Sequence, residues 1–191
     1  MKHVCVYCGS SGGENPGYVA MAGRLGSALA KRGIGLVFGG AGVGLMGAVA
    51  DAALAGGGSA CGIIPEAFAN RVAHPGLTET HVVGSMAERK KLMFDLSDGF
   101  IALPGGLGTL DELSELLTWS QLGFHTKPCG LINQDGYYDS LLSFFDHAAA
   151  TGFMHANHLE LLLVSGDPED LLDRMASYDP PIIDKWAKGS G

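Results

Sequence analysis

The chain has 191 residues, of which 47% are hydrophobic and 17% are charged, and it contains 30 glycines. This composition excludes a disordered or fibrous protein, and the length favours one compact domain. Twenty acidic and twelve basic residues leave a formal net charge of −8, which would repel a nucleic-acid backbone over most of the surface. We therefore expect no nucleic-acid partner, although backbone N–H groups could still hold a small anion.

Short continuous apolar runs recur along the chain and are typical of strands covered on both faces. They lie at residues 4–8, 34–38, 60–64, 100–103, 129–132 and 159–164. Helical patterns occupy residues 18–32, 45–55, 86–97, 110–123, 138–151 and 169–175, and residues 68–80 are expected to form a long irregular connection. This alternation predicts an α/β fold, a Rossmann-like doubly wound parallel sheet, in a single nucleotide-binding domain over residues 1–180 with a C-terminal tail at 181–191. Ligands of such sheets bind at the loops that follow the strands.

The four cysteines lie in or beside apolar runs, so burial as small hydrophobic side chains is the simplest interpretation. Cys5 and Cys8 have the C-x-x-C spacing of a redox motif or half a zinc site, but no second pair accompanies them. The seven histidines show no metal-ligand spacing, so we expect no metal. No apolar stretch approaches the roughly 18 residues that span a bilayer, and no leader pattern opens the chain, so we expect a cytoplasmic protein without a membrane partner.

The loop after the second predicted strand is rich in glycine. Residues 42, 44 and 47 satisfy G-x-G-x-x-G between a strand and a helix, where backbone N–H groups can hold a phosphate. Gly40, Gly42 and Gly44 are therefore candidate ligands, although a tight turn with close helix packing would need glycines too. An acid at Glu66, after the next strand, also keeps a dinucleotide-binding oxidoreductase open.

A second glycine loop, PGGLGTLDE at residues 104–112, follows the strand at 100–103 and opens the next helix. Two such loops on neighbouring strand ends could grip one small ligand from both sides. The candidate binding residues in this loop are consecutive: Gly105, Gly106, Leu107, Gly108 and Thr109. Thr109 and Glu112 also fit the capping box S/T-x-x-E, in which they would bind backbone N–H groups of the helix start and leave Glu112 less free for chemistry.

A basic cluster occupies the first turns of the helix predicted to begin at residue 86. Ser85 and Glu88 fit a capping box, but Arg89 and Lys90 lie where the positive end of the helix dipole disfavours cations. A bound anion would offset that cost, whereas a solvated basic face is the alternative. Met86 shares a helix face with Arg89, and Ser10 borders the expected crevice after the first strand.

Four stretches resemble the LOG (Lonely Guy) family, the cytokinin riboside 5'-monophosphate phosphoribohydrolases. They are PGGLGTLDE at 104–112, MAERK at 86–90, VCVYCGSS at 4–11 and TWSQLGFHTKP at 118–128, and the resemblance runs from about Val4 to Met154. It implies a Rossmann-like homodimer that needs no cofactor. It also implies hydrolysis of the N-glycosidic bond of AMP or N6-substituted AMP, which releases the free base and ribose 5-phosphate.

By position in the family's motifs, the resemblance implies that Arg89 and Glu112 are catalytic, and Lys90 matches as well. Two positions depart from the family pattern. Ala87 replaces a common histidine beside the substrate, and Ala41 replaces the third of three consecutive glycines in the first loop.

Breaking a ribosyl bond develops positive charge on the sugar, which the Glu112 carboxylate could stabilise while it orients or deprotonates water. The 5'-phosphate would bind both glycine loops with Thr109 and Ser10, and Arg89 would bind the phosphate or polarise the departing base. Met86 could contact the base. A non-catalytic carrier of a nucleotide or of the molybdenum cofactor is the main alternative, and an NAD-dependent oxidoreductase is the second.

Overall fold

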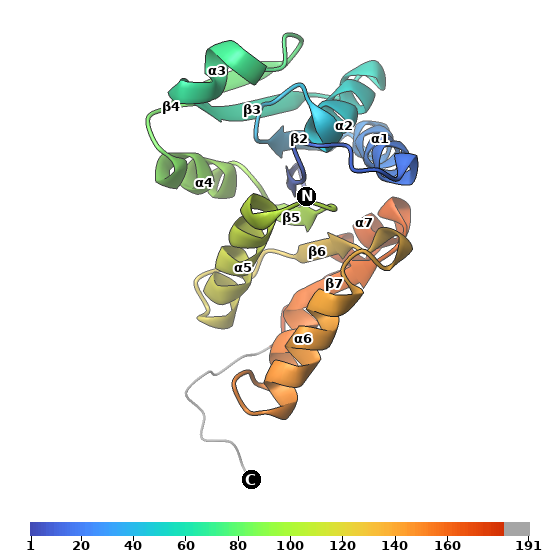
Figure 1. The fold of residues 1–191 in the computed structure, drawn as a ribbon, viewed down its shortest axis with the longest axis vertical. Coiled ribbons are helices and arrows are strands. Elements are labelled where there is room, and N and C mark those ends of the chain that lie inside the picture. The colour runs from blue at the N-terminus through green and yellow to red at the C-terminus, as the bar shows by residue number, and fades with distance from the viewer. Residues whose placement is uncertain (182–191) are drawn as a thin grey trace.

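The computed structural model describes residues 1–181, and the predicted tail beyond residue 181 lies outside the described residues. Within them the strands form one seven-stranded parallel sheet in the order β4-β3-β2-β1-β5-β6-β7 (Figure 1). The strands are β1 (His3–Tyr7), β2 (Gly35–Phe38), β3 (Ala60–Pro65), β4 (Glu79–Val83), β5 (Gly99–Ala102), β6 (Cys129–Ile132) and β7 (Leu162–Ser165). The predicted Rossmann-like α/β fold is confirmed.

Helices cover both faces of the sheet. They are α1 (Pro16–Lys31), α2 (Gly44–Ala55), α3 (Glu66–Val72), α4 (Met86–Asp95), α5 (Leu107–Gln121), α6 (Asp139–Ala150) and α7 (Pro168–Ala176), with short 3-10 helices η1 (Gln134–Gly136) and η2 (Ala156–Leu161). Alternate residues of β1 divide the core. Val4 and Val6 pack with α1, α2 and α7, whereas Cys5 and Tyr7 pack with α4 and α5. In Figure 1, α4 and α5 accordingly lie on the opposite side of the strands from α1 and α2. No helix within residues 1–181 is long and apolar enough to cross a membrane.

Two predicted segments differ from the structure. Residues 68–80 are not one irregular connection, because they include most of α3 and lead into β4. β4 lies at the edge of the sheet with exposed and half-buried residues, so it lacks the apolar run that marks the central strands, and α3 has no buried residue. The strand expected at 159–164 begins only at Leu162, because η2 takes up residues 156–161.

Three loops meet at the carboxyl ends of the central strands. β1 has β2 on one side and β5 on the other, so the strand order reverses there, which is where open α/β sheets form their ligand crevice. The Gly9 N–H donates to the Pro104 carbonyl at 3.0 Å, and the Leu45 N–H donates to the Gly9 carbonyl at 3.1 Å. These bonds fix the loops after β1 and β5 and the start of α2 against one another.

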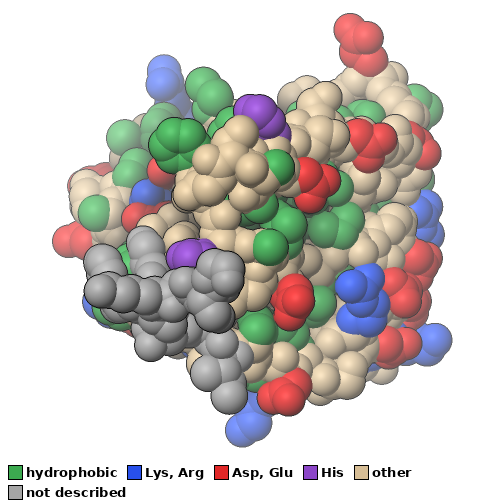
Figure 2. Space-filling model, turned by 90° about the horizontal axis from the view of Figure 1, so that it is seen from below, with side chains coloured by type: hydrophobic (Ala, Val, Ile, Leu, Met, Phe, Trp, Pro, Cys, Tyr) green, Lys and Arg blue, Asp and Glu red, His purple; other side chains and the backbone are tan. Residues whose placement is uncertain are grey.

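Several large apolar side chains remain exposed. Phe144 on α6 is 61% exposed, Phe124 after α5 is 73% exposed and Phe153 after α6 is 90% exposed. Figure 2 shows a face of the molecule on which hydrophobic side chains lie between charged ones.

Close packing of α1 on α2 depends on Gly26, and this can be tested with a matched pair of variants. A Cβ at Gly26 would overlap the Val49 carbonyl oxygen, whereas a Cβ at Gly23, in the same helix, would meet nothing within 4 Å. Gly23→Ala should therefore stabilise the protein by about 0.5–1 kcal/mol through helix propensity, and Gly26→Ala should destabilise it by about 2 kcal/mol or more. Urea denaturation measures both, and equal effects would contradict the proposed packing constraint.

Candidate active site

A cavity of about 290 Å³ opens where the loops after β1, β2 and β5 meet α4 and α5. Its walls include Ser10, Arg89, Gly106, Leu107, Gly108, Thr109 and Glu112, so seven residues predicted from separate motifs are brought together. A second cavity of about 330 Å³ adjoins it, because Gly9, Ser10 and Gly106 line both. Together they form one cleft over the centre of the sheet.

Arg89 of α4 and Glu112 of α5 form an ion pair inside this cleft. Arg89 Nη1 lies 3.2 Å from Glu112 Oε1, and Arg89 Nε donates to the Ile63 carbonyl at 3.0 Å. The two side chains are only 12% and 10% exposed. Gly39 makes room for them, because a Cβ there would occupy the position of the guanidinium group. The end of β3 and the first turn of the loop after β2 therefore set the position of Arg89.

The environment of Glu112 changes its acidity. Burial raises the pKa of Glu112 from 4.5 to about 7, against the opposing effect of the Arg89 cation. The negative charges of Asp111 and Glu115 act in the same direction as burial. Near neutral pH the carboxyl group therefore populates both its charged and its neutral form, which suits a group that exchanges a proton with a reactant.

The predicted capping box at Thr109 and Glu112 is wrong. α5 begins at Leu107 with Gly106 as its N-cap, so both residues lie inside the helix, and no side chain caps its start. Thr109 packs against Gly105, where a Cβ would overlap the hydroxyl group. Glu112 is consequently directed at Arg89, and the first-turn N–H groups of α5, which have no acceptor within the helix, open on the cleft.

The first glycine loop is shaped by packing. Gly40 has a positive φ of 77° and lies against Gly62 and Ile64 of β3, and the backbone of Gly44, with φ 58°, lies against Ser10. Gly42 already donates its N–H to the Val72 carbonyl at 2.8 Å. None of these three glycines lines the two cavities of the cleft. Their predicted role as phosphate ligands stays a prediction.

Lys90 and Met86 do not line these cavities either. Lys90 Nζ lies 3.1 Å from Asp111 and 3.2 Å from Glu115, so it ties α4 to α5. Met86 is 46% exposed at the start of α4, where Ser85 caps the helix by accepting from the Glu88 N–H at 3.2 Å.

Sequence analysis missed the groups that support the second glycine loop. Tyr137 donates its hydroxyl to the Gly105 carbonyl at 2.8 Å, and the buried Tyr138 donates to the Leu103 carbonyl at 2.6 Å. Tyr137 also lines the second cavity with Tyr18, whose ring it meets edge to face. Two adjacent tyrosines shortly after a strand are a signal that could have drawn attention to this loop.

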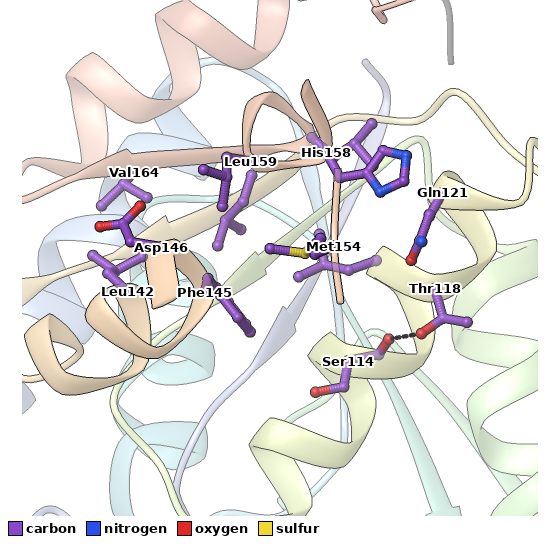
Figure 3. Close-up of a pocket in the computed structure, with 13 residues that line it drawn as sticks. Ser114, Thr118, Gln121, Leu142, Phe145, Asp146, Met154, His158, Leu159 and Val164 are labelled. Carbon is purple, nitrogen blue, oxygen red and sulfur yellow. Dashed lines mark hydrogen bonds between the residues drawn. The ribbon is translucent and has the colours of Figure 1, made fainter. Parts of the chain in front are cut away.

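A third cavity, of about 240 Å³, lies between α5, α6, η2 and β7 and shares no residue with the cleft (Figure 3). It is mainly apolar. Phe145, Met154 and Leu159 line it, with His158 and Gln121 at one end and Asp146 at the other. It contains none of the predicted site residues.

Comparison with known proteins identifies the family. The family described as "Possible lysine decarboxylase" matches residues 46–175. The cytokinin riboside 5'-monophosphate phosphoribohydrolase of Rhodococcoides fascians is 48% identical over 178 residues, which cover 92% of this chain and 90% of the relative. The chain belongs to the LOG family. The LOG7 enzyme of Arabidopsis thaliana, which carries the same enzyme name, is 44% identical over 188 residues, or 98% of this chain and 87% of the relative.

Solved structures share the fold of this LOG chain. The molybdenum cofactor binding protein of Rippkaea orientalis superposes with a TM-score of 0.71 and 25% identity, covering 93% of this chain and 97% of the other. The molybdenum cofactor carrier protein of Chlamydomonas reinhardtii gives a TM-score of 0.70 at 20% identity, which shows a shared fold only.

The family description names a decarboxylase, an activity that would use a lysine to form a Schiff base. Lys90, the lysine beside Arg89, does not suit that role in this LOG chain. Burial acts to lower the pKa of Lys90, but hydrogen bonds and charges from Asp111 and Glu115 outweigh it, so the pKa is raised. A lysine that forms a Schiff base needs the opposite shift, because only the neutral amine is a nucleophile.

The raised pKa of Glu112 predicts how stability depends on pH. Between pH 4.5 and about 7 the folded state holds a proton on Glu112 that the unfolded state has lost, so the wild type loses stability as pH rises through this range. The amide introduced by Glu112→Gln cannot ionise. The free energy of unfolding of this variant, measured relative to that of the wild type by urea denaturation, should therefore increase by an amount on the order of 3 kcal/mol from pH 4 to pH 8. A difference that is constant with pH would show that the carboxyl group titrates normally.

Proposed function

We propose that this chain hydrolyses the N-glycosidic bond of nucleoside 5'-monophosphates, with AMP and N6-substituted AMP as substrates. The products are the free base and ribose 5-phosphate. The observation that carries this proposal is the buried Arg89–Glu112 pair in a cleft beside the uncapped start of α5. The names of relatives that are 44–48% identical over most of the chain support the same activity.

The 5'-phosphate binds at the start of α5. The N–H groups of Leu107, Gly108 and Thr109 are the first three of this helix, and the helix dipole favours an anion there. Ser10, which lines both cavities, adds a hydroxyl donor from the loop after β1. This anchor leaves the ribose one helical turn from Glu112.

Glu112 acts on the anomeric carbon. As the bond from that carbon to the base nitrogen breaks, the electron pair leaves with the base and the sugar becomes cationic, which a carboxylate stabilises. A water molecule then forms the new bond to the anomeric carbon, and Glu112 accepts its proton, which its pKa near neutrality allows. The departing base takes up a proton from solvent water, and Glu112 later returns its own proton to solvent.

Arg89 holds the carboxylate in place. Its Nε is fixed by the Ile63 carbonyl, so its Nη1 presents one fixed donor to Glu112 Oε1. It also keeps a positive charge at the point where the base departs with its electron pair.

A carrier of the molybdenum cofactor is the second candidate function, because the structure of the Rippkaea orientalis cofactor-binding protein covers 93% of this chain. A protein that binds the molybdenum cofactor and releases no free base from nucleoside monophosphates would support this alternative. We further propose that the protein is a cytoplasmic homodimer, to which the exposed Phe124 and Phe153 could contribute an apolar contact surface.

Activity can be tested with AMP and isopentenyl-AMP, by chromatography of the released base. Glu112→Gln removes the carboxylate and should lower turnover by about 10² to 10³-fold. Glu115→Gln is the matched control on the same helix, and it should retain activity within about threefold because Lys90 keeps its contact with Asp111. No base release from any nucleoside monophosphate by the wild type would refute the proposed activity, and an unchanged rate in folded Glu112→Gln would refute the role of Glu112.

The pH profile tests the ionisation state of Glu112. Only the charged carboxylate stabilises the cationic sugar and accepts a proton, and this form is lost as pH falls below about 7. The value of kcat/KM for AMP should therefore fall about tenfold for each pH unit below that point. A profile that is flat from pH 5 to pH 8 would argue that Glu112 is not the titrating group.

A further inference from the structure

Three side chains that commonly bind metals meet on the strands β3 and β4. They are Cys61, Glu79 and His81, and their ligand atoms all lie within 4.8 Å of one another. The parallel register brings them together, because Cys61 is paired with Glu79 and the next residue on the same face, Ile63, is paired with His81. All three therefore project from one face of the sheet at its outer edge.

We propose that Cys61, Glu79 and His81 bind a zinc ion, with a water molecule as the fourth ligand. A tetrahedral zinc places its sulfur, nitrogen and oxygen ligands at about 2.0–2.3 Å from the metal and hence about 3.5 Å from one another. The observed separations are at most 4.8 Å and so exceed this distance by no more than about 1.3 Å, which side-chain rotation can close. A thiolate with an imidazole favours zinc over magnesium or calcium, which prefer oxygen ligands alone.

The surroundings of His81 support a ligand rather than a simple ion pair. Its Nε2 lies 2.9 Å from Glu79 Oε1, yet this nitrogen is shielded from solvent and has no partner with hydrogen-bond geometry within residues 1–181. Cys61 is a free thiol that is only partly buried, so an ion from solution can reach it. A thiol, a carboxylate and an imidazole, three different types of metal ligand, thus converge on one point.

The proposed site is separate from the cleft. Cys61 is near the start of β3, whereas the cleft lies beyond the carboxyl ends of the strands, and none of the three residues lines it. A bound zinc would join the edge strand β4 to β3. It would also brace Ile63, which pairs with His81 and whose carbonyl holds Arg89. The role is therefore structural, and its test does not depend on the proposed enzymatic activity.

Cobalt is a spectroscopic substitute for zinc and provides the first test. Titration of the wild type with Co²⁺ should give a thiolate-to-cobalt absorption band and intense visible bands of tetrahedral cobalt, which added Zn²⁺ abolishes. Both should be lost in Cys61→Ser and in His81→Gln, and both should persist in Cys129→Ala, which removes another cysteine of the sheet. No such band in the wild type, or an unchanged band in Cys61→Ser, would overturn the proposal.

A second test uses only the wild type, so misfolding of a variant cannot obscure it. Cys5, Cys8 and Cys129 are buried, so an alkylating reagent should modify Cys61 first. Saturating Zn²⁺ should slow that modification at least tenfold and raise the Tm by about 5–10 °C at 100-fold excess over Kd, whereas Mg²⁺ should do neither. Modification of Cys61 at the same rate with and without Zn²⁺ would exclude the site.

Discussion

The site depends on keeping a carboxyl group away from water beside a single cation. Desolvation alone would make Glu112 a neutral acid, and a fully matched ion pair would make it a permanent anion. One hydrogen bond of 3.2 Å from Arg89 leaves its pKa near 7, between these limits. The same burial that costs stability at neutral pH therefore leaves a carboxyl group that can gain or lose a proton near pH 7.

Backbone groups contribute much of the support for this arrangement. The Ile63 carbonyl fixes Arg89, and main-chain bonds join Gly9 to Pro104 and to Leu45. Side chains are absent where these segments approach most closely, as at Gly39, which faces the guanidinium group. Glycine thus allows the close approach of the loop after β2 to the Arg89 side chain of α4.

Lys90 is a motif residue that contacts α5 and does not line the cleft. Its ammonium group bridges Asp111 and Glu115 of α5, so it sets the spacing between the helix that carries Arg89 and the helix that carries Glu112. On the other side of Arg89, β3 provides the fixed carbonyl group of Ile63. The Arg89–Glu112 pair is therefore supported from a helix and from a strand.

The sequence alone determined the class of fold and the order of the central strands and helices along the chain, because buried strands and glycine loops leave local patterns. It also showed that Arg89 and Glu112 lie in motifs that resemble those of one family. It did not reveal β4, whose edge position removes the apolar run, nor the start of α5 at Leu107, which overturned the capping box. Only the tertiary structure decided which groups meet. The Ile63 carbonyl, the raised pKa of Glu112 and the approach of Cys61 to His81 all arise between segments distant in the chain, where contact depends on strand pairing and burial.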